Sequence, residues 1–317
     1  MRMCACRGTA GFAHVSCLVE QAKILFAEAE ENNLGPEALQ ARWDRWDRCS
    51  LCEQHYHRAV ACALGWACWK TYVERPETDQ FRGMAMNVLG LGLSGADHHE
   101  DALSVQEAEL SMRRRLGAPA TIILAAQNNL ATSYGCVGRL EDATRMQRDV
   151  YSGRLNLLGE EDERTLIAAN NYAAALVSLE HYEEAKALLR RTTPVARRVL
   201  GEGDRLTLKM RCVYAGALCQ DPSATLDDIS EAVTTLKEIE RTARRVMGRA
   251  HPLTTAIEHD LRDARAALRA REAEAVRVAE CDALQRDLDA TQARIAALDA
   301  SKAEVIGKLT PPGDAYG

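Results

Sequence analysis

Apolar residues along most of this chain recur with the period of an α-helix. Leu176, Leu179 and Tyr182, for example, follow one another at intervals of three residues. Residues three and four positions apart share one face of a helix, so this spacing predicts helices that bury one side against a neighbour. Near the start of the chain, two short helices are predicted over 18–31 and 37–47, separated by a Gly-Pro break.

Short sequence motifs return along the chain at a fixed interval. A Leu-Gly pair recurs every 42 residues, at 116–117, 158–159 and 200–201, and a Met-Gly variant follows 47 residues later. Small residues keep the same interval at positions where helices would cross: Ala131, Ala173 and Ala215. Self-similarity at this period is typical of a helical solenoid, in which each helical pair buries its apolar face against the next.

The interval predicts three clear helical pairs and a degenerate one. The clear pairs begin near Thr121, Arg164 and Arg205, and the degenerate pair covers 81–116. A capping helix is predicted from about Pro252. The fold class is therefore mainly α, with a solenoid as its largest part.

The repeats resemble tetratricopeptide repeats, in the longer version found in kinesin light chains. The sequence Asn-Asn-Leu-Ala at 128–131 returns as Asn-Asn-Tyr-Ala at 170–173, and the Leu-Gly pairs at 158–159 and 200–201 are each followed by Thr-Leu. The resemblance implies that a protein or peptide ligand binds the concave face formed by the first helix of each pair. It places four candidate ligand contacts on this face: Asn128, Thr132, Asn170 and Lys209. The alternative is that the asparagines tie adjacent helices together without touching a ligand.

A long helix is predicted at the end of the repeats. From 261 to 309 there is no proline and only one glycine. Apolar residues lie at coiled-coil spacing along it, interrupted by Lys302: Leu284, Leu288, Ile295, Leu298 and Val305, with Thr291 between them. This pattern fits weak self-association, and it also fits a solvated helix that folds back over the last repeat.

Cysteines gather at the start of the chain, where seven of the eleven precede residue 69. The candidate metal ligands lie in close pairs: Cys4 with Cys6, His14 with Cys17, and Cys49 with Cys52. Thiolates and neutral imidazoles suit Zn²⁺, and four of them complete a tetrahedron. The plainer interpretation is that these are buried thiols, because cysteine is among the most buried residue types.

The order and spacing of these pairs resemble the later part of the RING-CH (RING-variant) zinc finger, over residues 4–57. The resemblance implies one complete zinc site made by Cys4, Cys6, Cys49 and Cys52, and half of a second site made by His14 and Cys17. The opening Cys pair of the family has no counterpart in this sequence. Structural zinc would stabilise a segment with few large apolar residues, so chelation is expected to unfold residues 1–60 while the repeats stay helical.

The RING-CH resemblance also implies a partner and an activity. Such domains commonly recruit a ubiquitin-conjugating enzyme, so the chain would be an E3 ubiquitin ligase whose repeats choose the substrate. Gln21 stands where family members usually have a tryptophan. The alternative function is a non-enzymatic tetratricopeptide scaffold with a degenerate structural zinc finger.

Charge and composition exclude several other classes. The net charge of −6 argues against a general nucleic-acid or membrane-surface binder, which needs a basic excess. The odd number of cysteines and the absence of an apolar leader predict a reducing, cytoplasmic location. No phosphate-binding loop or nucleophile elbow is present, and no catalytic residue is assigned.

The predicted organisation is a zinc module followed by the solenoid and a helix. The predicted boundaries are 1–60 for the RING-like module, 61–80 for a linker, 81–270 for the repeats, 271–309 for the C-terminal helix and 310–317 for a disordered tail.

Overall fold

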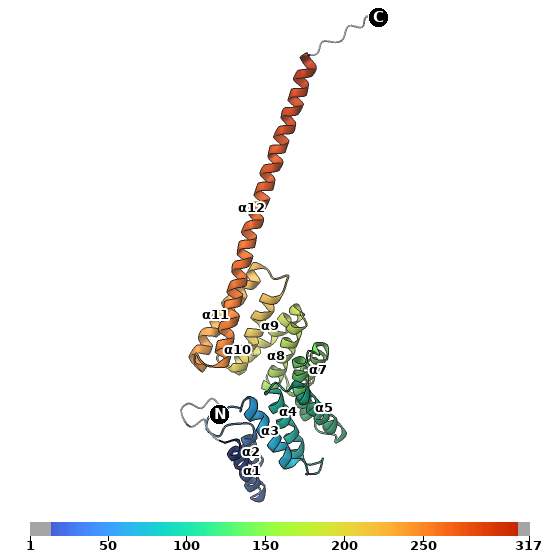
Figure 1. Ribbon diagram of the computed structural model, residues 1–317, viewed down its shortest axis with the longest axis vertical. Coiled ribbons are helices and arrows are strands. Elements are labelled where there is room, and N and C mark those ends of the chain that lie inside the picture. The colour runs from blue at the N-terminus through green and yellow to red at the C-terminus, as the bar shows by residue number, and fades with distance from the viewer. Residues whose placement is uncertain (1–13, 310–317) are drawn as a thin grey trace. The chain divides into compact units, whose positions relative to one another are not determined.

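The computed structural model describes residues 14–309, which fold into helices joined by short turns (Figure 1). Within this range, the one β contact is an isolated antiparallel bridge between Arg48 and His55. The chain forms two compact units, one ending at Ala217 and the other beginning at Leu218. Cys4, Cys6 and the predicted tail at 310–317 lie outside the described residues.

The first unit contains a short N-terminal helical group and the helical pairs of the solenoid. The N-terminal group consists of α1 (Val15–Glu31), α2 (Pro36–Trp43), the short 3₁₀ helix η2 (Asp44–Trp46) and α3 (Arg58–Tyr72). The pairs are α4 (Gln80–Ser94) with α5 (His99–Arg115), α6 (Ala120–Cys136) with α7 (Leu140–Leu158), and α8 (Glu163–Ser178) with α9 (Tyr182–Val199). Helix α10 (Arg205–Gln220) begins in the first unit and runs into the second.

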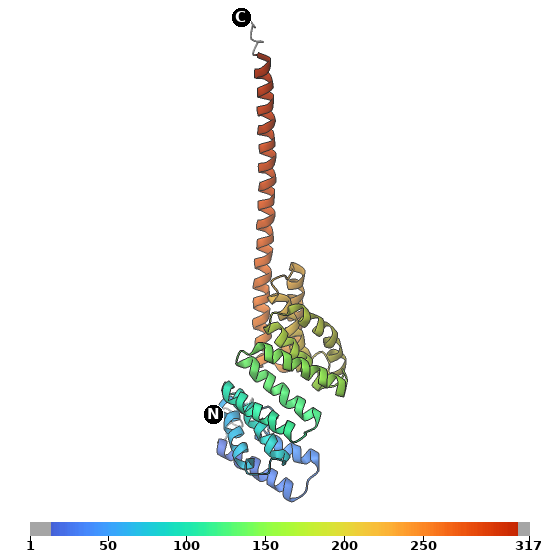
Figure 2. The same cartoon turned by 90° about the vertical axis from the view of Figure 1, so that its right-hand side faces the viewer.

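These pairs match the predicted repeats. Helices α6, α8 and α10 begin at Ala120, Glu163 and Arg205, each within one residue of the predicted start. From α3 to α9 each helix packs against the next, and the resulting hairpins follow one another in Figure 2. One core cluster joins α6 through α10, and buried alanines belong to it: Val150, Leu166, Leu176, Leu189 and Met210, together with Ala168, Ala173 and Ala185.

The repeated Leu-Gly motif has a backbone explanation. Gly159 is the residue after α7 and has a φ of 82°, and Gly201 follows α9 with a φ of 94°. A left-handed backbone strains residues that carry a Cβ, and glycine adopts it freely. The glycine that repeats in the sequence therefore marks the turn at which each second helix ends.

The N-terminal group is a packed extension of the first pair, which corrects the predicted linker at 61–80. Most of α3 lies in that range, and α3 packs closely against α4. The reason is the small size of two glycines: a Cβ on Gly65 would lie 3.0 Å from the Cα of Leu89, and one on Gly92 would lie 2.6 Å from the carbonyl oxygen of Ala61. The backbones of α3 and α4 therefore approach closely at both positions, and Gly92 has no room for a larger residue.

Aromatic side chains hold α1 and α2 against α3 and α4. Phe26 is 1% exposed and meets Trp43, Tyr72 and Phe81 edge-on, with ring centroids 5.1, 5.8 and 4.8 Å away. Trp46 is also buried in this cluster. Buried aromatic residues each remove a large apolar area from water. The sequence-based view that this segment buries few large apolar residues is therefore wrong.

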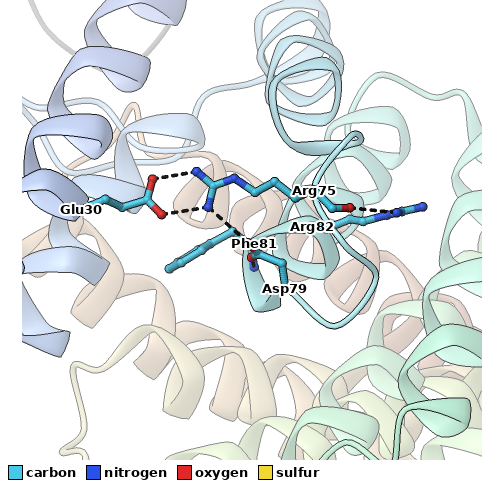
Figure 3. A network of polar contacts seen from close by, with 5 residues as sticks. All are labelled: Glu30, Arg75, Asp79, Phe81 and Arg82. Carbon is cyan, nitrogen blue, oxygen red and sulfur yellow. Dashed lines mark hydrogen bonds and ion pairs between the residues drawn. The ribbon is translucent and has the colours of Figure 1, made fainter.

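A polar network closes the edge of this aromatic core (Figure 3). The guanidinium of Arg75 donates to both carboxylate oxygens of Glu30 on α1, at 2.8 and 2.7 Å, and to Asp79 at 3.3 Å. The same guanidinium lies 4.9 Å from the ring centroid of Tyr72. Glu30 raises the pKa of Arg75, since it stabilises the charged form. This fork-to-carboxylate pair joins residues 45 positions apart and fixes α1 beside the α3–α4 turn.

The second unit consists of the end of α10, α11 (Leu226–Met247) and α12 (Pro252–Leu309). Thr225 caps α11 through a reciprocal pair of bonds with Asp228. The predicted capping helix and the predicted long helix are one continuous element, α12. Its first turns pack against α11, with Ile257, Leu261 and Ala264 buried. Among residues 14–309, no helix is both long and apolar enough to cross a membrane.

Candidate functional site

The first helices of successive pairs lie next to one another and form an inner layer. Helix α4 contacts α6, and α6 contacts α8, although a second helix of a pair separates them in sequence. Asparagines occupy equivalent positions on all three helices, at intervals of 41 and 42 residues: Asn87, Asn128 and Asn170. A face built this way presents the same chemical group once per repeat, which suits a ligand with a repeating backbone.

A chain of side-chain amides joins α6 to α8. Asn170 donates to the amide oxygen of Asn171 at 3.4 Å, and Asn171 donates to that of Asn128 at 3.0 Å. Asn128 in turn donates to Asn129 at 3.4 Å, and Gln147 of α7 donates to the backbone carbonyl of Asn128 at 3.4 Å. The Asn128 amide therefore ties adjacent repeats together, which is the alternative that the sequence leaves open for both asparagines.

Asn170 differs from Asn128 because its acceptor is unused. Its amide oxygen has no hydrogen-bond partner among the described residues, although the atom is shielded from solvent. A buried acceptor without a donor is costly, and a ligand N–H would remove that cost. Thr132 is exposed on α6, and its hydroxyl donates to the Asn128 carbonyl at 3.0 Å. Of the two asparagines, Asn170 is thus the better candidate for a ligand contact.

Lys209 supplies a positive charge on α10. Burial lowers the pKa of this half-buried lysine, and the charge of Arg205, one turn earlier on the same helix, lowers it further. No salt bridge to Lys209 is recorded within residues 14–309, whereas Arg211 on the same helix pairs with Glu202 at 3.6 Å. A lysine without a salt bridge in the described residues favours an anionic ligand group on α10.

The degenerate first pair contains a buried polar cluster that sequence analysis missed. Glu109 of α5 is 3% exposed, accepts from Arg113 at 3.4 Å and bonds Asn87 of α4. The guanidinium of Arg113 lies over Gly83, where a Cβ would be 2.5 Å from it. The 41-residue interval between Asn87 and Asn128 could have identified this asparagine. Its bond to Glu109 ties α4 to α5 and gives the first pair a buried acid that the other pairs lack at that position.

Burial raises the pKa of Glu109, and the bonds from Arg113 and Asn87 only partly oppose this. A carboxyl whose pKa is higher in the folded state favours folding below its unfolded pKa. This contribution is lost as the pH rises through the folded pKa. We therefore expect Glu109→Gln to gain stability relative to the wild type as the pH rises from about 4 toward 8, and the gain to level off once the pH passes the folded pKa of Glu109. Thermal unfolding across this pH range measures the difference. Glu274→Gln, the same change on an exposed face of α12, corrects for the loss of one carboxylate. A constant difference between Glu109→Gln and wild type would contradict the expectation.

The Cys49–Cys52 pair lies in a tight turn of the first unit. The backbone N–H of Leu51 donates to the sulfur of Cys49 at 3.4 Å, and the N–H of Glu53 donates to the Cys49 carbonyl at 2.9 Å. Glu53 adopts a left-handed φ of 57°. The ends of the turn are joined by bonds from the Cys49 N–H to Gln54 and from the Tyr56 N–H to Asp47, both 2.9 Å long. An N–H directed at sulfur stabilises a thiolate, the form that binds metals.

The other predicted zinc ligands are placed differently. His14 precedes α1 and Cys17 lies in its first turn, and both side chains are exposed. Within residues 14–309, no group of three or more His, Cys, Asp or Glu side chains could hold a metal ion. His14 and Cys17 therefore do not join Cys49 and Cys52 in one group among the described residues. Cys4 and Cys6, the proposed partners of Cys49 and Cys52, lie outside the described residues.

Comparisons with known proteins bear on the repeats. The tetratricopeptide repeat family model matches residues 122–198, which span α6 to α9. This confirms the predicted tetratricopeptide repeats over two of the three clear pairs. No curated protein matches the sequence.

Several solved structures are similar in fold. One is a point variant of a putative kinesin light chain from Podosopora anserina with nearly identical TPR-like repeats. It is 16% identical, with a TM-score of 0.49, and the match covers 74% of this chain and 99% of that one. Another is a Rap protein in complex with competence and sporulation factor, at 13% identity and a TM-score of 0.46, covering 80% and 65% of the two chains. BtubC from P. vanneervenii is 14% identical, with a TM-score of 0.38 and coverage of 81% and 93%.

Proposed function

We propose that this chain is a protein-interaction scaffold whose inner helices bind an extended peptide that carries an acidic residue. The observation that carries the proposal is the pair of unsatisfied groups on this layer. Asn170 has an amide oxygen without a donor, and Lys209 has a positive charge without a recorded acidic partner in the described part of the chain. A peptide supplies both missing groups, a backbone N–H for the amide and a carboxylate for the ammonium.

The geometry also supports different roles for the predicted contacts. Asn128 keeps α6 and α8 in register through Asn171, so it positions the inner layer. Asn170 and Lys209 contact the ligand in this proposal, and exposed Thr132 lines the approach on α6. Replacing Asn128 and Asn170 together would therefore mix a structural effect with a binding effect, and single variants separate them.

Binding to paired peptide arrays tests the proposal. One array carries extended peptides with Asp or Glu at varied positions, and the second replaces these residues with Asn or Gln. We expect the wild type to prefer the acidic array by about tenfold, which corresponds to about 1.4 kcal/mol. Lys209→Gln should abolish this preference, while Asn170→Ala should weaken binding to both arrays by about 3- to 10-fold, the effect of one hydrogen bond.

Matched variants at exposed positions elsewhere in the chain control for general effects. Asn156→Ala on α7 and Lys237→Gln on α11 make the same changes at exposed positions. Both are expected to bind like the wild type, and far-UV circular dichroism should show all four variants folded. Unchanged array binding by folded Asn170→Ala and Lys209→Gln proteins would refute the peptide site.

For the N-terminal segment we propose zinc binding by Cys49 and Cys52 together with Cys4 and Cys6. The turn that holds Cys49 and Cys52 supports this, because the Leu51 N–H is directed at the Cys49 sulfur and Cys49 is 6% exposed. When bound, zinc would supply a structural crosslink. A ubiquitin-conjugating enzyme, the partner that the RING-CH resemblance implies, would dock on this same folded segment. Ubiquitin transfer by the full chain, lost in Cys49→Ala/Cys52→Ala, would then mark the protein as an E3 ligase.

A further inference from the structure

The outer part of α12 extends away from the other helices of its unit and carries an unpartnered apolar face. Every residue from 269 to 303 is exposed, and the last side-chain contact recorded with the rest of the unit is the bond from Arg271 to the carbonyl of Pro222, 3.1 Å long. Beyond it, large apolar side chains are at least half solvent-exposed: Leu284 68%, Leu288 50%, Ile295 55%, Leu298 70% and Val305 53%. In both views α12 runs away from α11 over this stretch (Figures 1 and 2). The face is therefore not covered by a return of the helix onto the last repeat.

These side chains follow a strict alternation of three and four residues. In heptad notation, the a positions are Cys281, Leu288, Ile295 and Lys302, and the d positions are Leu284, Thr291, Leu298 and Val305. An average spacing of 3.5 residues keeps such a seam on one side of two helices that supercoil around each other. Single solvated helices have no reason to maintain this spacing. The occupant that fits the face is thus another helix with the same heptad pattern.

The residues in the seam favour two parallel strands. A β-branched residue at a position a, here Ile295, combined with leucine at d favours a parallel dimer. A single polar residue at a, here Lys302, limits the number of strands and fixes the register, at some cost in stability. Lysine can reach the edge of a two-stranded seam with its ammonium group in water, which is harder in the closed core of a larger bundle.

Charges beside the seam are compatible with the same arrangement. In a parallel pair, each g residue meets the e residue five positions later on the other strand. This places Arg294 next to Asp299 of the second strand, a pair of opposite charge. The remaining g-to-e pairs contain no two charges of the same sign: Glu280 with Gln285, Asp287 with Gln292, and Ser301 with Ile306. A second copy of this chain in register therefore meets no charge repulsion along the seam flanks.

We propose that residues 281–306 of α12 pair with the same residues of a second copy in a parallel, in-register, two-stranded coiled coil. The pairing makes the protein a dimer and joins two sets of repeats through their C-terminal helices. A peptide-binding face present twice in one particle increases the apparent affinity for a ligand that carries two binding segments.

The mass of the full chain in solution tests the pairing. Size-exclusion chromatography with light scattering, between about 1 and 100 μM protein, is expected to show a particle of twice the 34.9 kDa chain mass at the higher concentrations. Leu288→Glu/Ile295→Glu places two charges in the seam of each strand and should raise the dissociation constant by at least about 100-fold. Ala293→Glu/Ala300→Glu adds the same charges at exposed f positions, on the opposite side of the helix, and should leave the dimer intact.

Cys281 reports the orientation of the two strands. At an a position of a parallel, in-register pair, the two Cys281 residues face each other at a separation that a disulfide can bridge. Mild oxidation with diamide should therefore link two chains, as seen on a non-reducing gel, and Cys281→Ser should prevent the link. A monomer at 100 μM, a dimer that tolerates Leu288→Glu/Ile295→Glu, or a dimer without the Cys281 link would each overturn the proposal.

Discussion

Gly92→Ala is expected to destabilise the first unit by about 2 kcal/mol, and Gly92→Leu by more. A methyl group at this position would lie 2.6 Å from the carbonyl oxygen of Ala61 and 3.2 Å from the Cα of Cys62. Both atoms belong to the backbone of α3, so no side-chain rotation can relieve the clash and the two helices must separate. In an unconstrained helix the same change would stabilise the protein by up to about 1 kcal/mol, because alanine favours helix more than glycine does.

Gly135→Ala is the matched control for this prediction. Gly135 also lies inside an inner helix, α6, but a Cβ there would be 4.0 Å from its nearest neighbour, the Cβ of Ala143. This variant should therefore be as stable as the wild type or slightly more stable. Denaturant unfolding followed by circular dichroism measures both changes. If Gly92→Ala proves as stable as Gly135→Ala, the close approach of α3 and α4 is wrong.

The repeats are the part of the fold that is most readable in the sequence. The predicted helix starts lie within one residue of the observed ones, because the motif that repeats is the one that ends helices: Gly159 and Gly201 have left-handed backbones that other residues avoid. Alanine at the crossing positions is equally readable, since small residues at a fixed interval mark the places where helices approach closely. Glycines at helix ends and alanines at helix crossings return once per repeat, and such a repetition can be recognised in a single sequence.

The N-terminal helical group could not be predicted in this way, because its contacts are not repeated along the chain. Helix α3 lies where a linker is predicted, although its residues Gly65 and Cys68 pack against α4 and the aromatic core. Contacts such as the bond between Arg75 and Glu30 join residues 45 positions apart and occur once, so nothing in the sequence marks them as partners. The glycines of α4 are visible in the sequence, but their meaning depends on a helix that lies outside the repeat pattern.

The candidate site was also predictable only in part. The register of the repeats places Asn128 and Asn170 on the inner layer, but it cannot tell which one has a free acceptor. That difference arises because Asn171 bonds Asn128, while the oxygen of Asn170 has no equivalent donor in the described residues. At the next repeat the equivalent positions are Cys212 and Val213, so the chain of amides cannot continue onto α10. The repeat where this hydrogen-bond network ends depends on contacts between helices and is not visible in the repeat pattern. The network ends at Asn170, which is the proposed ligand contact.

Zinc removal is expected to unfold the Cys49–Cys52 turn while α1 and α2 stay docked. A structural zinc site contributes on the order of 10 kcal/mol of folding free energy, far more than the few backbone bonds that close this turn. From the sequence alone, all of residues 1–60 are expected to unfold on chelation. Because of the aromatic core, we now expect unfolding of the Cys49–Cys52 turn alone. Phe26 and Trp43 are buried against Tyr72 and Phe81, and these contacts do not require a metal.

Hydrogen exchange before and after chelation separates the two outcomes. Amides with bonds inside the turn, those of Cys49, Glu53 and Tyr56, should lose protection, while amides within α1 should keep most of theirs. Freshly purified protein should contain zinc, and Cys49→Ala/Cys52→Ala should remove it. Cys136→Ala/Cys281→Ala changes two exposed cysteines elsewhere and should leave the zinc content unchanged. Protein that contains no zinc, or zinc that persists in the Cys49→Ala/Cys52→Ala variant, would show that the turn is held by its hydrogen bonds and by the packing of Cys49, Tyr56 and Val60 alone.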